Sequence, residues 1–148
     1  MKTLLVCEST HHGNTRKLVN AITETYPVDV IDAAATDSID CSGYDCIGFA
    51  SGIAFGNFYK KITSLAAELP AGKKVFFLYT CGKENGSYDT SIREIAEARG
   101  CTVLGKYSCK GFDTFGPLKL LGGLNKNHPD ADEIRKAVEF YGDISKMI

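Results

Sequence analysis

The sequence predicts an α/β fold, a doubly wound three-layer sandwich built on a five-stranded parallel sheet. Three observations lead to this prediction. Short apolar runs alternate with amphipathic helical patterns along all 148 residues, the order that gives a parallel sheet covered by helices on both faces. Loops with glycine and hydroxyl residues follow the apolar runs. Neither a linker nor an internal repeat interrupts the pattern, so we expect a single domain over residues 1–148.

Five segments have the character of buried strands, because they are short, apolar and bounded by turn residues. The strongest contains the run Val-Phe-Phe-Leu-Tyr. In chain order the predicted strands are Lys2–Cys7, Val28–Asp32, Asp45–Ser51, Lys74–Thr80 and Thr102–Cys109.

Four segments place apolar residues three or four positions apart, which predicts helices with one buried face. Pro70 and Gly72 end the second of them, and Gly100 follows the third. The predicted helices are Asn14–Thr25, Phe58–Leu69, Ser87–Arg99 and Pro129–Lys146.

Composition excludes several classes of function. The net charge of −1 offers no electrostatic footprint for nucleic acid or an anionic membrane. No apolar run approaches the roughly 18 residues needed to span a bilayer. The chain begins directly with a predicted strand and has no secretory segment, so we expect a cytoplasmic protein. None of the six cysteines forms a C-x-x-C pair, which disfavours zinc and iron–sulfur sites, and no metal site is predicted.

The first loop is the most informative stretch of the chain. Ser9 and Thr10 supply hydroxyl groups after the first predicted strand, and Thr15 supplies a third at the start of the first predicted helix, which Asn14 can help cap. Backbone N–H groups at a helix N-terminus form an anion site together with the helix dipole. The loop is therefore suited to a phosphate monoester.

Two further loops lie at the carboxyl ends of predicted strands, where ligands bind in sheets of this kind. The loop Gly52–Phe58 is unusually apolar, which favours a flat wall for a planar ring, although Phe55 and Phe58 could instead turn into the core. The loop Cys81–Tyr88 offers backbone donors and an aromatic residue, although it could be an exposed turn with Ser87 as a helix cap.

Together these motifs resemble flavodoxin, in its short-chain form. The run from Thr10 to Thr15 is similar to the family's phosphate loop, Phe55-Gly56-Asn57 to its flavin-contacting turn, and Cys81-Gly82 up to Tyr88 to its third loop. The resemblance covers all five strand–helix units and implies the strand order 2-1-3-4-5. Other phosphate-binding families fit less well: a low-molecular-weight tyrosine phosphatase needs Arg where Gly13 stands, and a receiver domain needs Asp where Ser51 stands.

The resemblance implies an FMN cofactor and no catalytic residue, because the protein tunes the flavin by packing, hydrogen bonds and charge. Phe55 and Tyr88 are implied to pack on the two flavin faces. The Gly56 carbonyl is implied to accept a hydrogen bond from N5 once N5 carries a proton in the semiquinone. The residues implied to bind the cofactor are Ser9, Thr10, His11, His12, Gly13, Asn14, Thr15, Ser51, Gly52, Ile53, Phe55, Gly56, Asn57, Cys81, Gly82, Lys83, Ser87 and Tyr88.

The implied function is low-potential electron transfer between redox partner proteins, by a monomer or weak dimer. Four features depart from the familiar flavodoxins. They are a near balance of 18 acidic and 17 basic residues, His11 and His12 at loop positions often held by small hydroxyl residues, Lys83 in the third loop, and a long apolar segment at Lys110–Pro129. The charge balance and the long segment favour an alternative, an FMN-dependent NAD(P)H oxidoreductase acting on a quinone or similar acceptor. We expect the segment Phe112–Leu124 to cover the flavin edge or to contact a partner.

Overall fold

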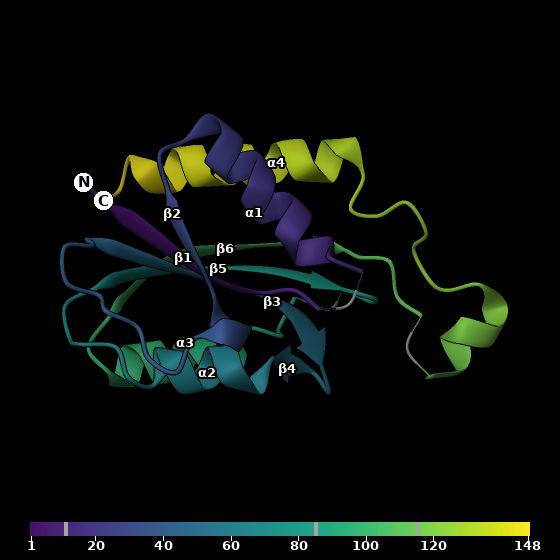
Figure 1. Cartoon of the computed structure of the whole chain (residues 1–148), viewed down its shortest axis with the longest axis horizontal. Coiled ribbons are helices and arrows are strands. Elements are labelled where there is room, and N and C mark those ends of the chain that lie inside the picture. Colours follow the sequence, from purple (N-terminus) through teal and green to yellow (C-terminus); the bar gives the residue numbers. More distant parts are fainter. Residues whose placement is uncertain (11, 85, 115) are drawn as a thin grey trace.

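The computed structural model describes residues 1–10, 12–84, 86–114 and 116–148 (Figure 1). Strands and helices alternate along the chain, with short 3₁₀ segments after β2 and after β6. The elements are β1 (Thr3–Glu8), α1 (Asn14–Thr25), β2 (Asp29–Asp32), η1 (Ala33–Ala35), β3 (Cys46–Ala54), β4 (Asn57–Phe58), α2 (Lys60–Ala66), β5 (Lys74–Cys81), α3 (Thr90–Ala98), β6 (Thr102–Lys110), η2 (Gly116–Leu121) and α4 (Ala131–Ser145).

The sheet has the order β2-β1-β3-β5-β6, and each neighbouring pair along this path is parallel. These five strands are the five that the sequence predicts, so both the fold class and the order 2-1-3-4-5 are confirmed. The short strand β4 lies off this path and pairs antiparallel with the end of β3. All parallel strands therefore deliver their carboxyl ends to one edge of the sheet.

Helices cover both faces of the sheet, with α1 and α4 on one side and α2 and α3 on the other (Figure 1). Alternation along β1 divides its side chains between the two layers. Leu5 and Cys7 are buried among residues of α1 and α4, whereas Leu4 and Val6 are buried among residues of α2 and α3. The apolar strand interiors predicted from sequence thus hold both layers to the sheet.

The structure corrects the predicted loop Gly52–Asn57 and the start of the helix that follows it. Strand β3 continues to Ala54 and turns directly into β4, so this stretch is a hairpin, and α2 begins at Lys60. The cause is Phe58, whose buried ring packs edge-on against Phe77 and Tyr79. Phe58 therefore turns into the core, one of the two readings that the sequence left open.

The third helix begins at Thr90 rather than at Ser87, because Asp89 holds the preceding turn against the sheet. Asp89 is only 3% exposed. Its carboxylate accepts hydrogen bonds from Lys106 of β6 at 2.6 Å and from Arg93 at 3.0 Å. Burial alone would raise the pKa of Asp89, but the bonds from Lys106 and Arg93 outweigh it, and the pKa lies below its ordinary 3.8.

Replacing Asp89 with Asn is expected to lower the free energy of unfolding at pH 7 by about 1–3 kcal/mol, because two cations lose their acceptor. A depressed carboxyl pKa contributes stability that is present above the unfolded pKa and lost as pH falls through the lower folded pKa. The gap between wild type and variant should therefore close below about pH 4. Urea unfolding between pH 3 and 7 measures this. The exposed Asp37 pairs with Lys61, and Asp37→Asn should change little at any pH. A constant gap across the range would show that Asp89 acts by shape alone.

The segment between β6 and α4 projects beyond the sheet edge and carries η2 (Figure 1). Asp113 and Leu124 pair through two backbone hydrogen bonds and close its base. Leu120 and Leu121 are 90% and 80% exposed near its tip. Among the described residues, no helix is both long enough and apolar enough to cross a membrane.

Candidate functional site

A cavity of about 510 Å³ opens at the carboxyl edge of the sheet, within the size range of cofactor sites, about 300–1,000 Å³. It is bounded by the segments that follow β1, β5 and β6 and by the β3–β4 hairpin. Its lining residues are Glu8, Ser9, Thr10, Asn14, Thr15, Gly52, Ile53, Ala54, Phe55, Tyr59, Thr80, Cys81, Gly82, Gly111, Phe112 and Asp113.

The first loop delivers the N-terminus of α1 to this cavity. His12 and Gly13 both have left-handed backbone, with φ of 56° and 65°, which turns the chain sharply into the helix. Ser9 Oγ accepts a hydrogen bond from the Arg16 N–H at 3.1 Å, and so satisfies one of the open donors in the first turn. Asn14 was predicted to cap the helix, but its side-chain amide donates instead to the Phe112 carbonyl at 2.8 Å.

Two hydroxyl groups meet on the floor of the cavity. Thr15 is fully buried, and its Oγ1 lies 2.8 Å from Thr80 Oγ1 at the end of β5. Hydroxyl groups rotate freely, so this pair can donate one hydrogen to the other and direct the second toward the cavity. The floor beneath the α1 N-terminus thus offers hydroxyl and backbone donors, the groups that bind a phosphate.

The β3–β4 hairpin presents an aromatic ring beside the cavity. Phe55 and Gly56 form its two-residue turn with φ of 53° and 77°, the signature of a type I′ turn, in which Asn-Gly is the favoured pair. A phenylalanine in left-handed backbone is unusual and costs on the order of 1–2 kcal/mol. Its side chain is 93% exposed and lines the cavity. The backbone conformation of this turn therefore does not by itself favour phenylalanine at position 55.

Replacing Phe55 with Asn is expected to move stability and ligand binding in opposite directions. The change creates the favoured Asn-Gly turn, so the free energy of unfolding should rise by about 0.5–1 kcal/mol. The family resemblance implies a flavin contact at Phe55, so flavin affinity should fall by the roughly 0.5–1.5 kcal/mol that an aromatic contact contributes. Urea unfolding of the apoprotein and fluorescence titration with FMN measure the two effects. A variant that is less stable and binds FMN as well as wild type would remove Phe55 from the site.

The third side of the cavity, after the first loop and the β3–β4 hairpin, is formed by the end of β5 and the segment after β6. The Gly111 N–H donates to the Cys81 carbonyl at 2.9 Å, and Asn125 donates to the Gly82 carbonyl at 2.5 Å. Asp113 lies so close to Gly82 that a Cβ there would come within 2.3 Å of its Oδ2. Glycine at position 82 therefore allows the Asp113 carboxylate to reach the cavity edge.

His12 connects the segment after β6 to the first loop. Its ring lies 4.4 Å from the Phe112 ring, centroid to centroid, and its Nε2 is 2.8 Å from Thr114 Oγ1. The bond from Asn14 to the Phe112 carbonyl adds a third connection. These contacts hold the start of the long segment after β6 against the first loop, between β1 and α1.

The cavity brings together about half of the residues that the sequence singles out. Those that line it are Ser9, Thr10, Asn14, Thr15, Gly52, Ile53, Phe55, Cys81 and Gly82. Eight others lie outside the cavity lining, namely His12, Gly13, Ser51, Gly56, Asn57, Lys83, Ser87 and Tyr88, while His11 lies outside the described residues.

Two of these eight residues make contacts away from the cavity lining. The Tyr88 ring packs edge-on against Tyr79, and its hydroxyl donates to the Lys83 carbonyl. The Ser51 hydroxyl donates to the Gly52 carbonyl and accepts from the Tyr59 N–H.

Seven lining residues were not among those implied to bind the cofactor: Glu8, Ala54, Tyr59, Thr80, Gly111, Phe112 and Asp113. Two of them, Phe112 and Asp113, belong to the segment Phe112–Leu124 that was expected to cover the flavin edge or to contact a partner. Four of the seven have a sequence signal that could have identified them. Glu8, Thr80, Gly111 and Phe112 stand at or just beyond the ends of predicted strands, where ligand-binding loops begin. Tyr59 was not identified because the sequence assigned it to the predicted helix Phe58–Leu69.

Cys81 lines the cavity, but its thiol is not a nucleophile. Burial raises the pKa of Cys81 to about 12, with smaller contributions from the carboxylates of Glu84 and Glu133. The thiol therefore stays protonated at neutral pH and acts as a small apolar surface.

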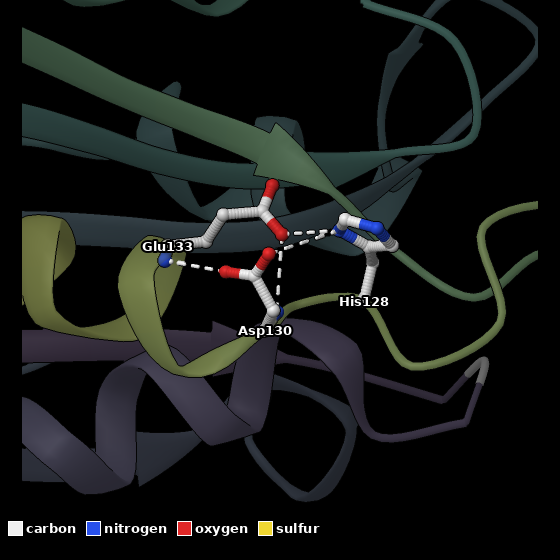
Figure 2. Close-up of side chains that lie close together, drawn as sticks. All are labelled: His128, Asp130 and Glu133. Atoms are coloured by element: carbon white, nitrogen blue, oxygen red, sulfur yellow. Dashed lines mark hydrogen bonds and ion pairs between the residues drawn. The ribbon is translucent and has the colours of Figure 1, made fainter.

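His128, Asp130 and Glu133 point toward one another at the start of α4 (Figure 2), with potential ligand atoms within 4.8 Å of each other. Their hydrogen bonds assign them a structural role. Asp130 Oδ1 accepts from the Glu133 N–H at 2.8 Å, and Glu133 Oε1 accepts from the Asp130 N–H at 3.0 Å, which is a capping box. Glu133 Oε1 also contacts His128 Nδ1, and its Oε2 accepts from the Lys110 N–H at 3.1 Å. The cluster fastens the long segment to α4 and β6.

No protein-family model matches the chain. The uncharacterized protein MJ0298 of Methanocaldococcus jannaschii is 39% identical over 151 residues, which cover 99% of this chain and 99% of that protein. The chain belongs to the same family as this archaeal protein.

Solved structures place the fold among the flavodoxins. A flavodoxin from the domain Archaea matches with a TM-score of 0.67 at 18% identity, covering 99% of this chain and 98% of that one. An FMN-bound flavoprotein of Lactobacillus acidophilus NCFM matches with a TM-score of 0.55 at 18% identity, covering 74% and 92%. The apo form of the NADH:FMN oxidoreductase EMOB matches with a TM-score of 0.55 at 13% identity, covering 94% and 86%. The fold is flavodoxin-like, as the sequence motifs predict.

Proposed function

We propose that the chain binds one FMN non-covalently in the cavity and transfers electrons between redox partners. The observation that carries this proposal is the cavity itself. It joins the hydroxyl-lined N-terminus of α1 to the aromatic hairpin turn and to the glycine edge after β5. A phosphate donor set beside a flat apolar wall suits a ligand with a phosphate at one end and a planar ring at the other.

The residues present fit FMN better than FAD. The backbone N–H groups at the start of α1 and the hydroxyls of Thr10 and Thr15 are suited to a terminal phosphate monoester. Phe55 and the backbone of Gly52 and Gly82 stand where a ring would be held. The bound flavin would supply the redox chemistry, and these residues would bind and orient it.

We expect the partners to be a reductase and an acceptor protein in the cytoplasm, met by a monomer or weak dimer. A broad acidic face is not expected, since acidic and basic residues number 18 and 17. The projecting segment with exposed Leu120 and Leu121 lies beyond the cavity-lining residues Gly111–Asp113. We propose this segment as a surface for partner contact.

The exposed leucines also favour a second candidate, an FMN-dependent oxidoreductase that takes hydride from a nicotinamide and reduces a quinone or similar acceptor. Mixing the FMN-loaded protein with NADH or NADPH under anaerobic conditions separates the two functions. An electron carrier loses its flavin colour only when a separate reductase is added. Rapid bleaching by the nicotinamide alone would overturn the carrier assignment in favour of the enzyme.

A further inference from the structure

Glu8 places a carboxylate in the cavity, beside the first loop that is proposed to hold the phosphate. It is the last residue of β1 and pairs in register with Ser51 of β3. Because side chains alternate along a strand, Glu8 shares the face of Leu4 and Val6, on the α2 side of the sheet. There it lines the cavity.

One oxygen of this carboxylate is unsatisfied in the described part of the protein. Glu8 Oε2 is buried and has no hydrogen-bond partner among the described residues. Burial raises the pKa of Glu8, the Asp32 carboxylate at the end of β2 raises it further, and Lys61 of α2 lowers it less. A buried acceptor without a donor destabilises the fold, so its position in a ligand cavity requires an explanation.

A second acceptor in the same cavity, Asn14 Oδ1, is also buried and unsatisfied among the described residues. Asn14 is 5% exposed, and its Oδ1 is buried without a hydrogen-bond partner in the described chain, while its amide donates to Phe112. Two such acceptors indicate a ligand that carries hydrogen-bond donors. An ionised phosphate offers none and repels a carboxylate, and the face of an aromatic ring offers none either.

We propose that Glu8 accepts a hydrogen bond from a hydroxyl group of the ribityl chain of the bound flavin, and thereby selects ligands that carry this chain. The inference rests on the proposed function. Glu8 directly precedes the loop expected to hold the phosphate, whereas the expected ring-binding segments follow β3 and β5. The chain of hydroxyl groups in FMN lies between its phosphate and its ring, which matches the place of Glu8.

Three ligands and three variants test this assignment. The ligands are FMN, riboflavin, which lacks the phosphate, and lumiflavin, which carries a methyl group in place of the ribityl chain. The variants are Glu8→Ala, Glu8→Gln and Glu68→Ala, the last being a control at an exposed position. Dissociation constants come from quenching of flavin fluorescence. Thermal unfolding without ligand checks the fold, and Glu8→Ala should not lower the midpoint, because an unsatisfied group is removed.

For Glu8→Ala we expect riboflavin affinity to fall about tenfold or more, the usual cost of losing a hydrogen bond to a charged group. Glu8→Gln should bind riboflavin with intermediate affinity, because its amide oxygen still accepts. Lumiflavin affinity should be the same in all variants. Equal losses for riboflavin and lumiflavin, or no loss for riboflavin, would overturn the role of Glu8 and leave FMN binding intact. A wild-type protein that binds none of the three flavins would instead overturn the proposed function.

Discussion

Replacing Thr15 with Val is expected to weaken FMN binding about ten- to a hundredfold while leaving riboflavin binding nearly unchanged. Thr15 is fully buried in the first turn of α1, and its hydroxyl pairs with that of Thr80 at the cavity floor. Valine keeps the shape of threonine and removes the hydroxyl group. The lost bond to a charged phosphate is worth about 1.5–3 kcal/mol, which corresponds to this change in affinity.

Comparing the two ligands isolates the phosphate contact, because riboflavin lacks only that group. Thr25→Val is the matched control, since Thr25 lies at the far end of the same helix and its hydroxyl donates to the Ala21 carbonyl. Fluorescence titration of wild type and both variants gives the dissociation constants. Equal losses of FMN and riboflavin affinity in Thr15→Val would mean that Thr15 supports the loop and does not contact the phosphate.

Replacing Asp113 with Asn is expected to raise the second one-electron potential of the bound flavin by about 20–40 mV. Reduced flavin carries its negative charge at the pyrimidine end, which the Cys81–Gly82 segment is expected to border. The Asp113 carboxylate lies against Gly82 at the cavity edge. Two charges 4 Å apart interact by about 4 kcal/mol at an effective dielectric constant of 20, before solvent reduces this sharply. A surviving 0.5–1 kcal/mol gives about 20–40 mV for one electron.

Lys83 provides the comparison for Asp113. A lysine beside the reduced flavin would raise this potential, because its positive charge attracts the flavin anion. Lys83, however, is exposed and is not among the lining residues. We therefore expect Lys83→Gln to shift the potential by much less than Asp113→Asn and in the opposite direction. Spectroelectrochemical titration at low and high salt measures both variants. A larger shift from Lys83 than from Asp113 would reverse the assignment of the dominant charge.

The fold was predictable because its signals are local. Lys74–Thr80 reads as a strand from its own residues, and the alternation of strands and helices determines a parallel sheet with right-handed crossovers. The first loop was equally predictable, since Ser9, Thr10 and Thr15 stand close together in sequence around the start of a helix. All three line the cavity in the structure.

Other parts of the site depend on contacts between distant segments. Phe112 reaches the first loop through a hydrogen bond from Asn14, 98 residues away in sequence, and no local pattern predicts it. Phe55 stands in a hairpin turn rather than a loop because Phe58 is buried against β5, a packing effect that helical periodicity concealed. Tyr88 matches a family motif, yet it packs against Tyr79 outside the cavity lining.

Titrating the purified apoprotein with FMN and with FAD, followed by the visible absorption and fluorescence of the flavin, tests the central claim most directly. We predict that FMN binds with one molecule per chain, with quenched fluorescence, and that FAD binds much more weakly. Failure to bind FMN, or a preference for FAD, would contradict the assignment of the cavity as an FMN site.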